Sequence, residues 1–171
     1  IDRGEARGHE QLAAVVGEPA AELIAIARLL GLQGHPPDEL AGVGYEWLEL
    51  GPYGYLPTDP ARLSDELDRR GLTVAGGTMH GESGLHRRGD WPAIEAKTRK
   101  VAELTAAVGG RHLVFVPVPG YRDDTTGAYL EPAELTGEEW TTMVRAADEL
   151  GRIVAGDYGV ALQFHPHADS H

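Results

Sequence analysis

The fold class is decided by the stretch Val160-Ala161-Leu162-Gln163-Phe164-His165-Pro166-His167. Side chains alternate along a strand, so Gln163, His165 and His167 share one face while the leucine and the phenylalanine take the other. In a parallel barrel the apolar face packs on helices, and the polar face points inward at the carboxyl end of the strand, where such barrels hold their active sites. Two imidazoles at this spacing predict a metal-ligand or acid/base pair. The alternative is that both histidines are loop residues hydrogen-bonded to backbone.

The composition describes an acidic chain of 171 residues with 42% hydrophobic residues and a formal net charge of -12. This length predicts a single domain. The absence of Cys excludes a disulfide scaffold and thiolate metal sites, and it fits a cytoplasmic location. Because there is neither a long apolar run nor a signal-peptide pattern, we expect no membrane insertion and no secretion. The 15 basic residues form no clustered stripe against 27 acidic ones, which favours a small neutral or phosphorylated metabolite over nucleic acid.

Short apolar runs predict four strands, at 45–50, 72–75, 112–118 and 160–164. Because helix-period segments separate these runs, the strands are expected to be parallel and joined by right-handed crossovers. We expect the strand at 160–164 to pair with the strand that contains Val114, and both to be buried. This order of elements favours a barrel or a doubly wound sheet. Dinucleotide binding would require a G-x-G-x-x-G turn after a strand, and the chain has none there.

Three helices are expected between these strands. The first begins with Asp59 as its cap and Pro60 at its first position, and Gly71 ends it. The second opens at Gly89 or Asp90 and ends at the Gly109-Gly110 pair, with a core stripe of Ile94, Thr98, Val101, Thr105 and Val108. The third starts at a T-x-x-E capping box, and its expected core stripe is Trp140, Met143, Val144, Ala147, Leu150 and Val154.

Several motifs then resemble one superfamily. They are GYEWLELGPYGYLPTD at 44–59, Arg70-Gly71-Leu72, and Phe164-His165-Pro166-His167-Ala168. These stretches resemble the xylose isomerase-like TIM barrels, and within them the inosose dehydratases and sugar phosphate isomerases/epimerases. The resemblance implies an α/β fold, a partial TIM (β/α) barrel, with residues 38–171 as its N-terminal portion. Residues 1–37 are an atypical segment with one Ala-rich helix at about 18–30.

The resemblance also implies a chemistry. These enzymes of carbohydrate metabolism and inositol catabolism polarise the carbonyl of a keto sugar or keto-cyclitol with a divalent metal, Mn, Co or Mg, and abstract the neighbouring proton. The function expected here is therefore that of a metal-dependent lyase or isomerase on a small-molecule sugar or cyclitol. Whether this chain is itself an enzyme stays open, because the alternative is a catalytically incomplete, inactive half-barrel fragment. The endonuclease branch of the superfamily is disfavoured by the acidic charge.

The resemblance and the strand parity together name the candidate site residues. Many relatives have a metal-binding Glu-Pro at the end of the fifth strand, and His165-Pro166 stands there, so His165 is the expected metal ligand. His167 and Glu49 are the catalytic candidates, although a buried Glu49 could equally serve as a structural hydrogen-bonding residue. The substrate-binding candidates are Trp47, Tyr53 and Tyr55, with turn packing as the alternative for the two tyrosines. His80 is a weaker candidate, and the histidines expected at the surface or in packing are His9, His35, His86 and His112.

The chain is shorter than its relatives. A full barrel needs about 250 residues, so the remaining metal ligands, an Asp, a His and a Glu, are expected to lie beyond His171. Two unpaired sheet edges would then be exposed, with 160–164 at one of them, and we expect self-association. Our hypothesis for residues 1–37 is a reading-frame interruption or a mis-assembled gene start, which an uninterrupted frame in the source DNA would contradict.

Overall fold

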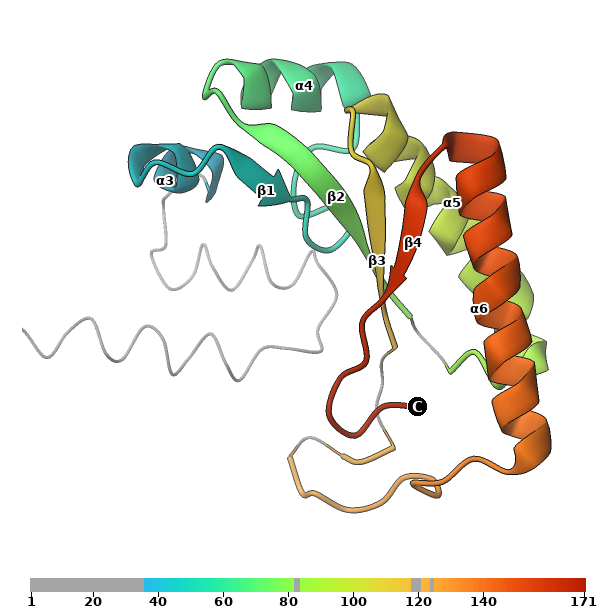
Figure 1. Cartoon of the computed structure of the whole chain (residues 1–171). Helices are drawn as coiled ribbons and strands as arrows, with labels where there is room; N and C mark the ends of the chain where they lie inside the picture. The colour runs from blue at the N-terminus through green and yellow to red at the C-terminus, as the bar shows by residue number, and fades with distance from the viewer. Residues whose placement is uncertain (1–35, 82–83, 118–120, 124) are drawn as a thin grey trace, which may run out of the picture.

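The computed structural model describes residues 36–171 except 82–83, 118–120 and 124. Its elements alternate between helices and strands, and the four strands form one sheet in the order β1-β2-β3-β4 (Figure 1). The strands are β1 (Trp47–Glu49), β2 (Thr73–His80), β3 (His112–Val116) and β4 (Ala161–Phe164). The helices are α3 (Pro36–Gly42), α4 (Pro60–Asp68), α5 (Trp91–Ala107) and α6 (Gly137–Tyr158), with a 3-10 turn η1 (Arg88–Asp90) before α5.

The parallel sheet is confirmed. All three strand pairs are parallel, and β3 pairs with β4 in the register His112 to Ala161 through Phe115 to Phe164. The expected burial of the last strand is wrong, however. Val160 is buried at 1% exposure, but β4 itself is half-buried at Leu162 and exposed at its other three residues. The reason is that β4 lies at the edge of the described sheet, where no further strand covers it.

The second strand differs most from its expected bounds. It runs to His80 and does not stop at Ala75, while β1 and β3 are shorter than predicted. Its pairing with β1 shifts register: Leu48 pairs with Val74, but Glu49 pairs with Gly76, so Ala75 is an extra residue on β2. Such a bulge places two residues of one strand opposite one residue of its partner. It therefore reverses the side-chain alternation of β2 beyond Ala75.

The crossover helices α4, α5 and α6 lie on one side of the sheet (Figure 1). A doubly wound sheet would carry helices on both faces, so the arrangement favours the barrel. The predicted caps are present: the Asp59 side chain accepts from the backbone N–H of Arg62 at the start of α4. Thr136 and Glu139 form the complete capping box of α6. None of the helices in the described part of the chain has the length and apolar character to cross a membrane.

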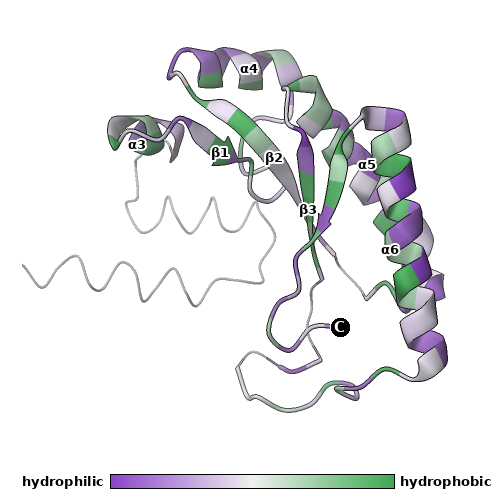
Figure 2. Ribbon diagram, viewed as in Figure 1, coloured by the Kyte–Doolittle hydropathy of each residue, from purple (hydrophilic) through white to green (hydrophobic). Residues whose placement is uncertain are grey.

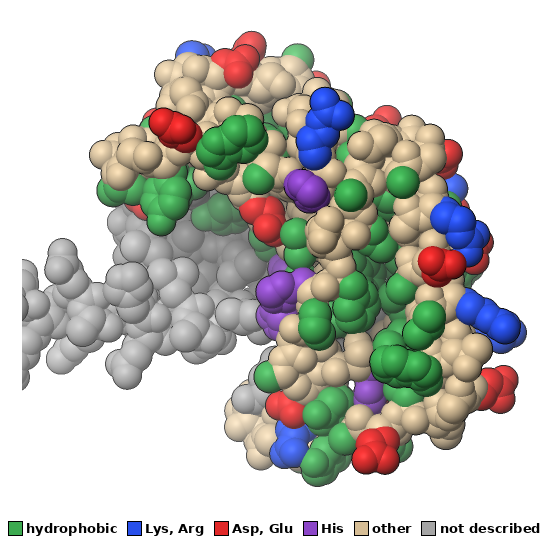
Figure 3. Space-filling model, in the orientation of Figure 1, with side chains coloured by type: hydrophobic (Ala, Val, Ile, Leu, Met, Phe, Trp, Pro, Cys, Tyr) green, Lys and Arg blue, Asp and Glu red, His purple; other side chains and the backbone are tan. Residues whose placement is uncertain are grey.

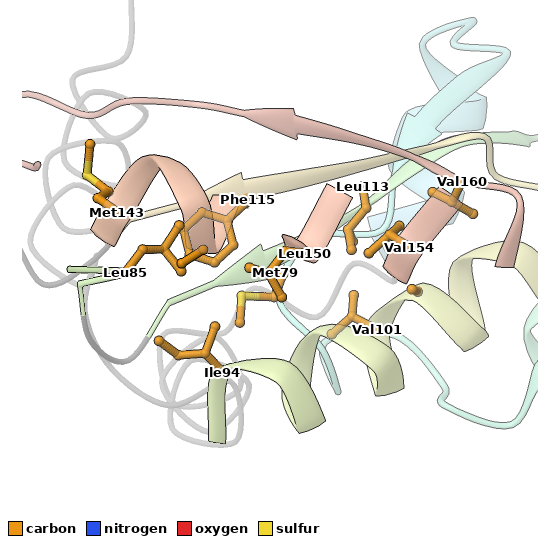
Figure 4. Close-up of a cluster of buried hydrophobic side chains, with 12 residues drawn as sticks. Met79, Leu85, Ile94, Val101, Leu113, Phe115, Met143, Leu150, Val154 and Val160 are labelled. Atoms are coloured by element: carbon orange, nitrogen blue, oxygen red, sulfur yellow. The ribbon is translucent and has the colours of Figure 1, made fainter. Parts of the chain in front are cut away.

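Two apolar clusters hold the helices on the sheet. The larger joins β2 and β3 to α5 and α6 (Figure 4), and its buried members include Met79, Leu85, Ile94, Val101, Leu113, Phe115, Leu150 and Val154. The smaller joins β1 and β2 to α4 and the end of α5 through Leu48, Leu63, Leu67, Val74 and Leu104. Figure 2 shows apolar and polar residues alternating around α6, as its amphipathic sequence predicts.

Two residues of the predicted α6 core stripe are outside the core. Trp140 is 57% exposed and Val144 is 48% exposed. The buried residues of α6 are Met143, Ala146, Leu150 and Val154. A helix on a complete barrel would bury both flanks between neighbouring helices, but α6 has a described neighbour only on its α5 side. The other flank therefore stays open.

Glycine in β2 sets the spacing between sheet and helix. A Cβ atom added to Gly77 would lie 2.1 Å from Oγ1 and 3.3 Å from Cβ of Thr105 on α5. Thr105 is fully buried, and its hydroxyl donates a 2.7 Å hydrogen bond to the Val101 carbonyl. The close approach of α5 to β2 thus depends on a residue without a side chain at this point.

Candidate functional site

The face of the sheet away from the helices, here called the open face, carries polar side chains. Beyond the bulge, strand alternation places Thr78 and His80 on this face, because the flanking Gly77 and Met79 face α5. The Thr78 hydroxyl donates a hydrogen bond to the Glu49 carboxylate. Thr78 is only 6% exposed. The hydrogen bond therefore joins the exposed Glu49 carboxylate to a hydroxyl that is buried in the neighbouring strand.

Glu49 is therefore on the open face, as strand parity predicts, but the expectation that it is buried is wrong. It is exposed at the end of β1, and its partner Thr78 was not identified from the sequence. Trp47 belongs to the same strand and shares the parity of Glu49, with Leu48 buried between them. Trp47 is 59% exposed, and it extends the open face with an aromatic surface.

His80 lies where several charges meet. Burial lowers the pKa of its imidazole below the ordinary value of 6.5, and Lys97 and His167 lower this pKa further. Glu49 acts in the opposite direction. Electrostatic interactions of this kind require proximity, so Glu49 and His167 both lie around His80 although they come from opposite ends of the described chain. His80 was only a weak candidate from the sequence, yet both catalytic candidates act on the charge of its imidazole, which is mainly neutral at pH 7 because its pKa is lowered.

His165 and His167 follow β4 at its carboxyl end. The N–H groups of Ala161 and His165 donate to the carbonyls of Arg111 and Phe115, each at 2.9 Å. The strand geometry therefore continues through His165 and keeps its side chain on the face of Gln163. The rings of His165 and His167 meet edge to face with centroids 5.1 Å apart. Both are exposed.

A second contact crosses the open face at its other end. Nε2 of Gln163 and Nδ1 of His112 lie 3.2 Å apart. His112 is at the amino end of β3, so this contact lies toward the amino end of the sheet and is separate from the carboxyl-end site. Figure 3 shows histidine side chains, in purple, at two heights along this part of the molecule with an acidic side chain between them. His112, which was expected at the surface or in packing, is exposed, and its ring lies within hydrogen-bonding distance of the Gln163 amide.

The two tyrosines lie elsewhere. Tyr53 is half-buried and packs against both apolar clusters, and Nζ of Lys100 on α5 is 4.6 Å from the centre of its ring. Tyr55 is 38% exposed and lines a shallow groove with Thr58, Asp59 and Arg62. Burial and the nearby Glu39 raise the pKa of Tyr55. These contacts agree with turn packing, which was the alternative to a substrate-binding role.

The sequence did not indicate a cluster in the loops at the carboxyl end of the sheet. Oε1 of Glu131 is 3.6 Å from Nε2 of His171, and Oε2 is 3.9 Å from Nε2 of His86. The two imidazoles meet edge to face at 5.2 Å, and burial lowers the pKa of His86. Arg87 adds an ion pair to Glu131. These residues lie in loops, where no strand or helix periodicity relates their positions in the sequence. Their proximity is therefore seen only in the folded chain.

The residues of the open face do not complete a metal centre. Across the described residues, no group of three or more His, Asp or Glu side chains converges to hold a metal ion. His165 and His167 could supply two imidazole ligands, whereas a catalytic zinc-type site usually takes three protein ligands. The expected ligand role of His165 is thus compatible with its position but needs further donors.

Comparisons with known proteins identify the fold. No protein-family model matches the chain. A xylose isomerase-like TIM barrel protein from Mycobacterium smegmatis, solved in complex with magnesium, is similar at a TM-score of 0.60 and 13% identity, over 90% of this chain and 49% of that chain. A sugar phosphate isomerase/epimerase from Parabacteroides distasonis is similar at a TM-score of 0.55 and 16% identity, over 82% and 47%. The described chain is thus a partial β/α barrel.

Its particular type follows from these neighbours and one curated relative. The chain has the fold of the xylose isomerase-like TIM barrel superfamily, as the sequence motifs predicted. Over 145 residues it is 28% identical to an inosose dehydratase from Bacillus velezensis, a match that covers 78% of this chain and 43% of that protein. The chain therefore spans less than half the length of this relative and about half the length of the solved barrels.

Proposed function

We propose that the carboxyl end of the open face is the proton-transfer site of an enzyme acting next to the carbonyl of a keto-cyclitol or keto sugar. One observation carries this proposal: Glu49 at the end of β1, His80 at the end of β2 and His167 in the segment after β4 gather at this end of a parallel sheet. Active sites of β/α barrels lie at this end of the strands. The similarity to an inosose dehydratase and to a sugar phosphate isomerase/epimerase supports the substrate class.

The residues suggest a division of roles. Glu49, oriented by Thr78, takes the proton from the carbon next to the carbonyl, and the electron pair moves to the carbonyl oxygen to form an enediol. His167 donates a proton either to the departing β-hydroxyl, which leaves as water, or to the carbonyl oxygen. The neutral imidazole of His80 hydrogen-bonds the sugar hydroxyls between them. Trp47 offers an apolar surface to the C–H face of the ring.

A divalent metal, when bound, would polarise the substrate carbonyl. His165 is the residue of this chain that would hold it, with His167 beside it. Since the described residues supply no third ligand, no step above depends on the metal. The same observation favours a second candidate, a half-barrel that binds sugar but does not complete a reaction.

Exchange of the substrate proton for solvent deuterium separates these candidates. A keto-inositol is incubated with the chain in D₂O, and incorporation next to the carbonyl is followed by NMR. We expect incorporation above the buffer rate without net loss of water, because the proton-transfer groups are present and the metal ligands are incomplete. Glu49→Gln is expected to abolish it, whereas Asp65→Asn, an exposed carboxylate change on α4, leaves it intact. Wild-type exchange at the buffer rate would contradict proton transfer and favour the binding-only half-barrel.

A further inference from the structure

The proton donor of the proposed reaction, His167, lies just beyond the sheet. The N–H of His165 donates to the Phe115 carbonyl at 2.9 Å, and among the described residues no later backbone hydrogen bond joins this segment to β3. Pro166 follows, and its ring fixes one backbone angle of the connection. The position of the His167 imidazole therefore depends on what holds the residues that come after it.

His167 begins a tight turn. Its N–H donates to Oγ of Ser170 at 3.0 Å, and the hydroxyl and N–H of Ser170 donate back to the His167 carbonyl at 2.9 and 3.2 Å. Within the turn Asp169 has a φ of 60°, a left-handed conformation in which Asp is more frequent than most residues other than glycine. These bonds make residues 167–170 one unit, so a contact that fixes Asp169 also fixes His167.

Asp169 is attached to the loop after β3 through both its backbone and its side chain. The N–H of Tyr121 donates to the Asp169 carbonyl at 2.6 Å. Nε of the next residue, Arg122, is 3.1 Å from Oδ1 of Asp169. Burial, and then the hydrogen bond to the Asp169 carboxylate, raise the pKa of the Tyr121 hydroxyl. Two adjacent residues thus hold the turn. Figure 1 shows the segment after β4 and the loop after β3 extending together from the carboxyl end of the sheet.

Arg122 is ordered by its own loop. Its guanidinium lies 4.2 Å from the centre of the Tyr129 ring and donates to the Tyr129 hydroxyl at 2.5 Å. Arg122 and Tyr129 also form an antiparallel bridge, and the N–H of Leu130 donates to the Tyr121 carbonyl at 2.9 Å. Because these contacts already restrict the arginine, its pairing with Asp169 costs little further side-chain entropy.

We propose that Arg122 and Asp169 form a clamp that positions His167 for proton transfer. This inference rests on the proposed function, but neither residue of the clamp touches substrate, since both act through the turn at 167–170. A proton donor must stay within hydrogen-bond reach of the oxygen that it protonates. A misplacement of about 1 Å can lower a rate about 100-fold. The clamp therefore holds a side chain whose charge already acts on His80 at the centre of the site.

The clamp has a position effect that is separable from stability. The side chains of Arg122 and Asp169 are 37% and 45% exposed, and an ion pair this exposed adds little to the free energy of unfolding. Its removal should therefore change the mobility of His167 while the urea midpoint and the circular dichroism stay the same.

The first experiment measures nitrogen-15 relaxation of the His167 amide in the full chain without substrate. Arg122→Met keeps a long side chain beside Tyr129 and removes the ion pair. We expect the order parameter to fall from about 0.85, the value of a rigid backbone, to below about 0.6. Arg152→Met is the matched control, because it removes an Arg–Asp pair of the same 3.1 Å length from α6 and should leave the order parameter unchanged.

Two variants of Asp169 test the clamp from its other side. Asp169→Gly adopts the left-handed φ without strain but has no carboxylate, so it should free His167 as Arg122→Met does. Asp169→Asn retains an acceptor oxygen, and Asn also tolerates this conformation. It should therefore keep the order parameter close to that of the wild type.

The second experiment follows the same variants by deuterium exchange into a keto-inositol, which requires His167 to protonate the carbonyl oxygen. We expect kcat to fall about 10- to 100-fold in Arg122→Met and in Asp169→Gly. KM should not change, because the surfaces proposed to bind substrate are untouched. Both losses come from one contact, so the double variant should lose no more than either single variant. Asp169→Asn should restore kcat.

The two experiments separate the clamp from the proposed chemistry. An order parameter that is the same in the wild type, Arg122→Met and Asp169→Gly would overturn the clamp. A mobile His167 with unchanged kcat would overturn its positioning role. Exchange at the buffer rate in the wild type would instead contradict the proposed function, and the order parameter would still decide whether Arg122 and Asp169 hold the turn.

Discussion

At the residue scale, Thr78 controls how Glu49 is presented. The carboxylate lies at the end of β1, where it has solvent around it, and the buried Thr78 hydroxyl restrains it from the neighbouring strand. We expect Thr78→Val to lower the free energy of unfolding by about 1 kcal/mol, since one hydrogen bond is lost and water solvates the carboxylate instead. Urea unfolding measures this change.

The same variant has a functional consequence under the proposed chemistry. Deuterium exchange into substrate should fall, since Glu49 samples more rotamers, while Thr78→Ser retains the hydroxyl and should retain exchange. Thr78→Val with unchanged exchange would show that the hydrogen bond does not orient the base.

The neutral state of His80 makes stability depend on pH. Its pKa in the folded chain is below 6.5, mainly through burial, and burial acts on His86 in the same direction. The unfolded chain therefore binds these protons more readily, so stability is complete above about pH 6.5 and falls as the pH drops toward the folded pKa. We expect a lower urea midpoint at about pH 5.5 than at about pH 7.5. His80→Gln and His86→Gln should each reduce the difference, and a slope unchanged in the double variant would contradict this.

Sequence reasoning located some of these residues and missed others for a definite reason. Glu49 and His165 follow simple strand alternation, which placed them on the open face. Thr78 and His80 follow the extra residue at Ala75, and alternation counted from the buried Val74 would have sent both toward α5. The Ala-Gly-Gly stretch at 75–77 has no residue pattern that predicts the position of the bulge. The partners of Glu49 were therefore not predictable from alternation alone.

At the element scale, helix ends were predictable and lateral packing was not. The caps at Asp59 and Thr136 act through local hydrogen bonds, so a short stretch of sequence is sufficient to identify them. Gly159, with a φ of 66°, ends α6 in the same local way. By contrast, the exposure of Trp140 and Val144 depends on what stands beside α6, and hydrophobic spacing contains no information about a missing neighbour.

The contact between β2 and α5 gives a prediction at this scale. Gly77→Ala would bring a methyl group within contact of the buried Thr105 hydroxyl, and we expect a loss of about 1–3 kcal/mol in the free energy of unfolding. Thr105→Ala removes the clashing atoms, so the double variant should recover part of that loss. A double-mutant cycle by urea unfolding measures the coupling. Additive effects would contradict a direct contact.

At the scale of the whole molecule, the histidines that the described sheet brings together predict how strongly the chain binds a metal ion. We expect the purified chain to bind Mn²⁺ or Co²⁺ weakly and to complete no dehydration, since the described residues offer at most two adjacent imidazoles. His165→Ala should weaken this binding further, whereas His112→Ala, at the other end of the sheet, should not. Calorimetry measures the affinity. Tight stoichiometric metal, or dehydration of a keto-inositol, would contradict the prediction.

The parallel topology was predictable because apolar runs alternate with helix-period segments, and the barrel type was predictable because the quoted motifs resemble those of known barrels. The sheet of the structure and the similar solved barrels agree with both predictions. The match to about half of each relative also agrees with the partial barrel inferred from chain length. The loop cluster around Glu131 was beyond reach, because its members are brought together only by the path of the folded chain.

The extra residue in β2 has a consequence for how this protein can change. Ala75 separates the part of β2 that pairs beside Leu48 from the part that carries Thr78 and His80. Deleting Ala75 would remove the extra residue and leave a strand of regular alternation, in which Val74, Gly77 and Met79 all still face the helices. A single-codon deletion at 75 would thus keep Met79 in the apolar cluster and His80 on the open face, and would change only the local bend and twist of β2. The bulge is therefore a position at which this strand can change its length by one residue without turning the site to the other face of the sheet.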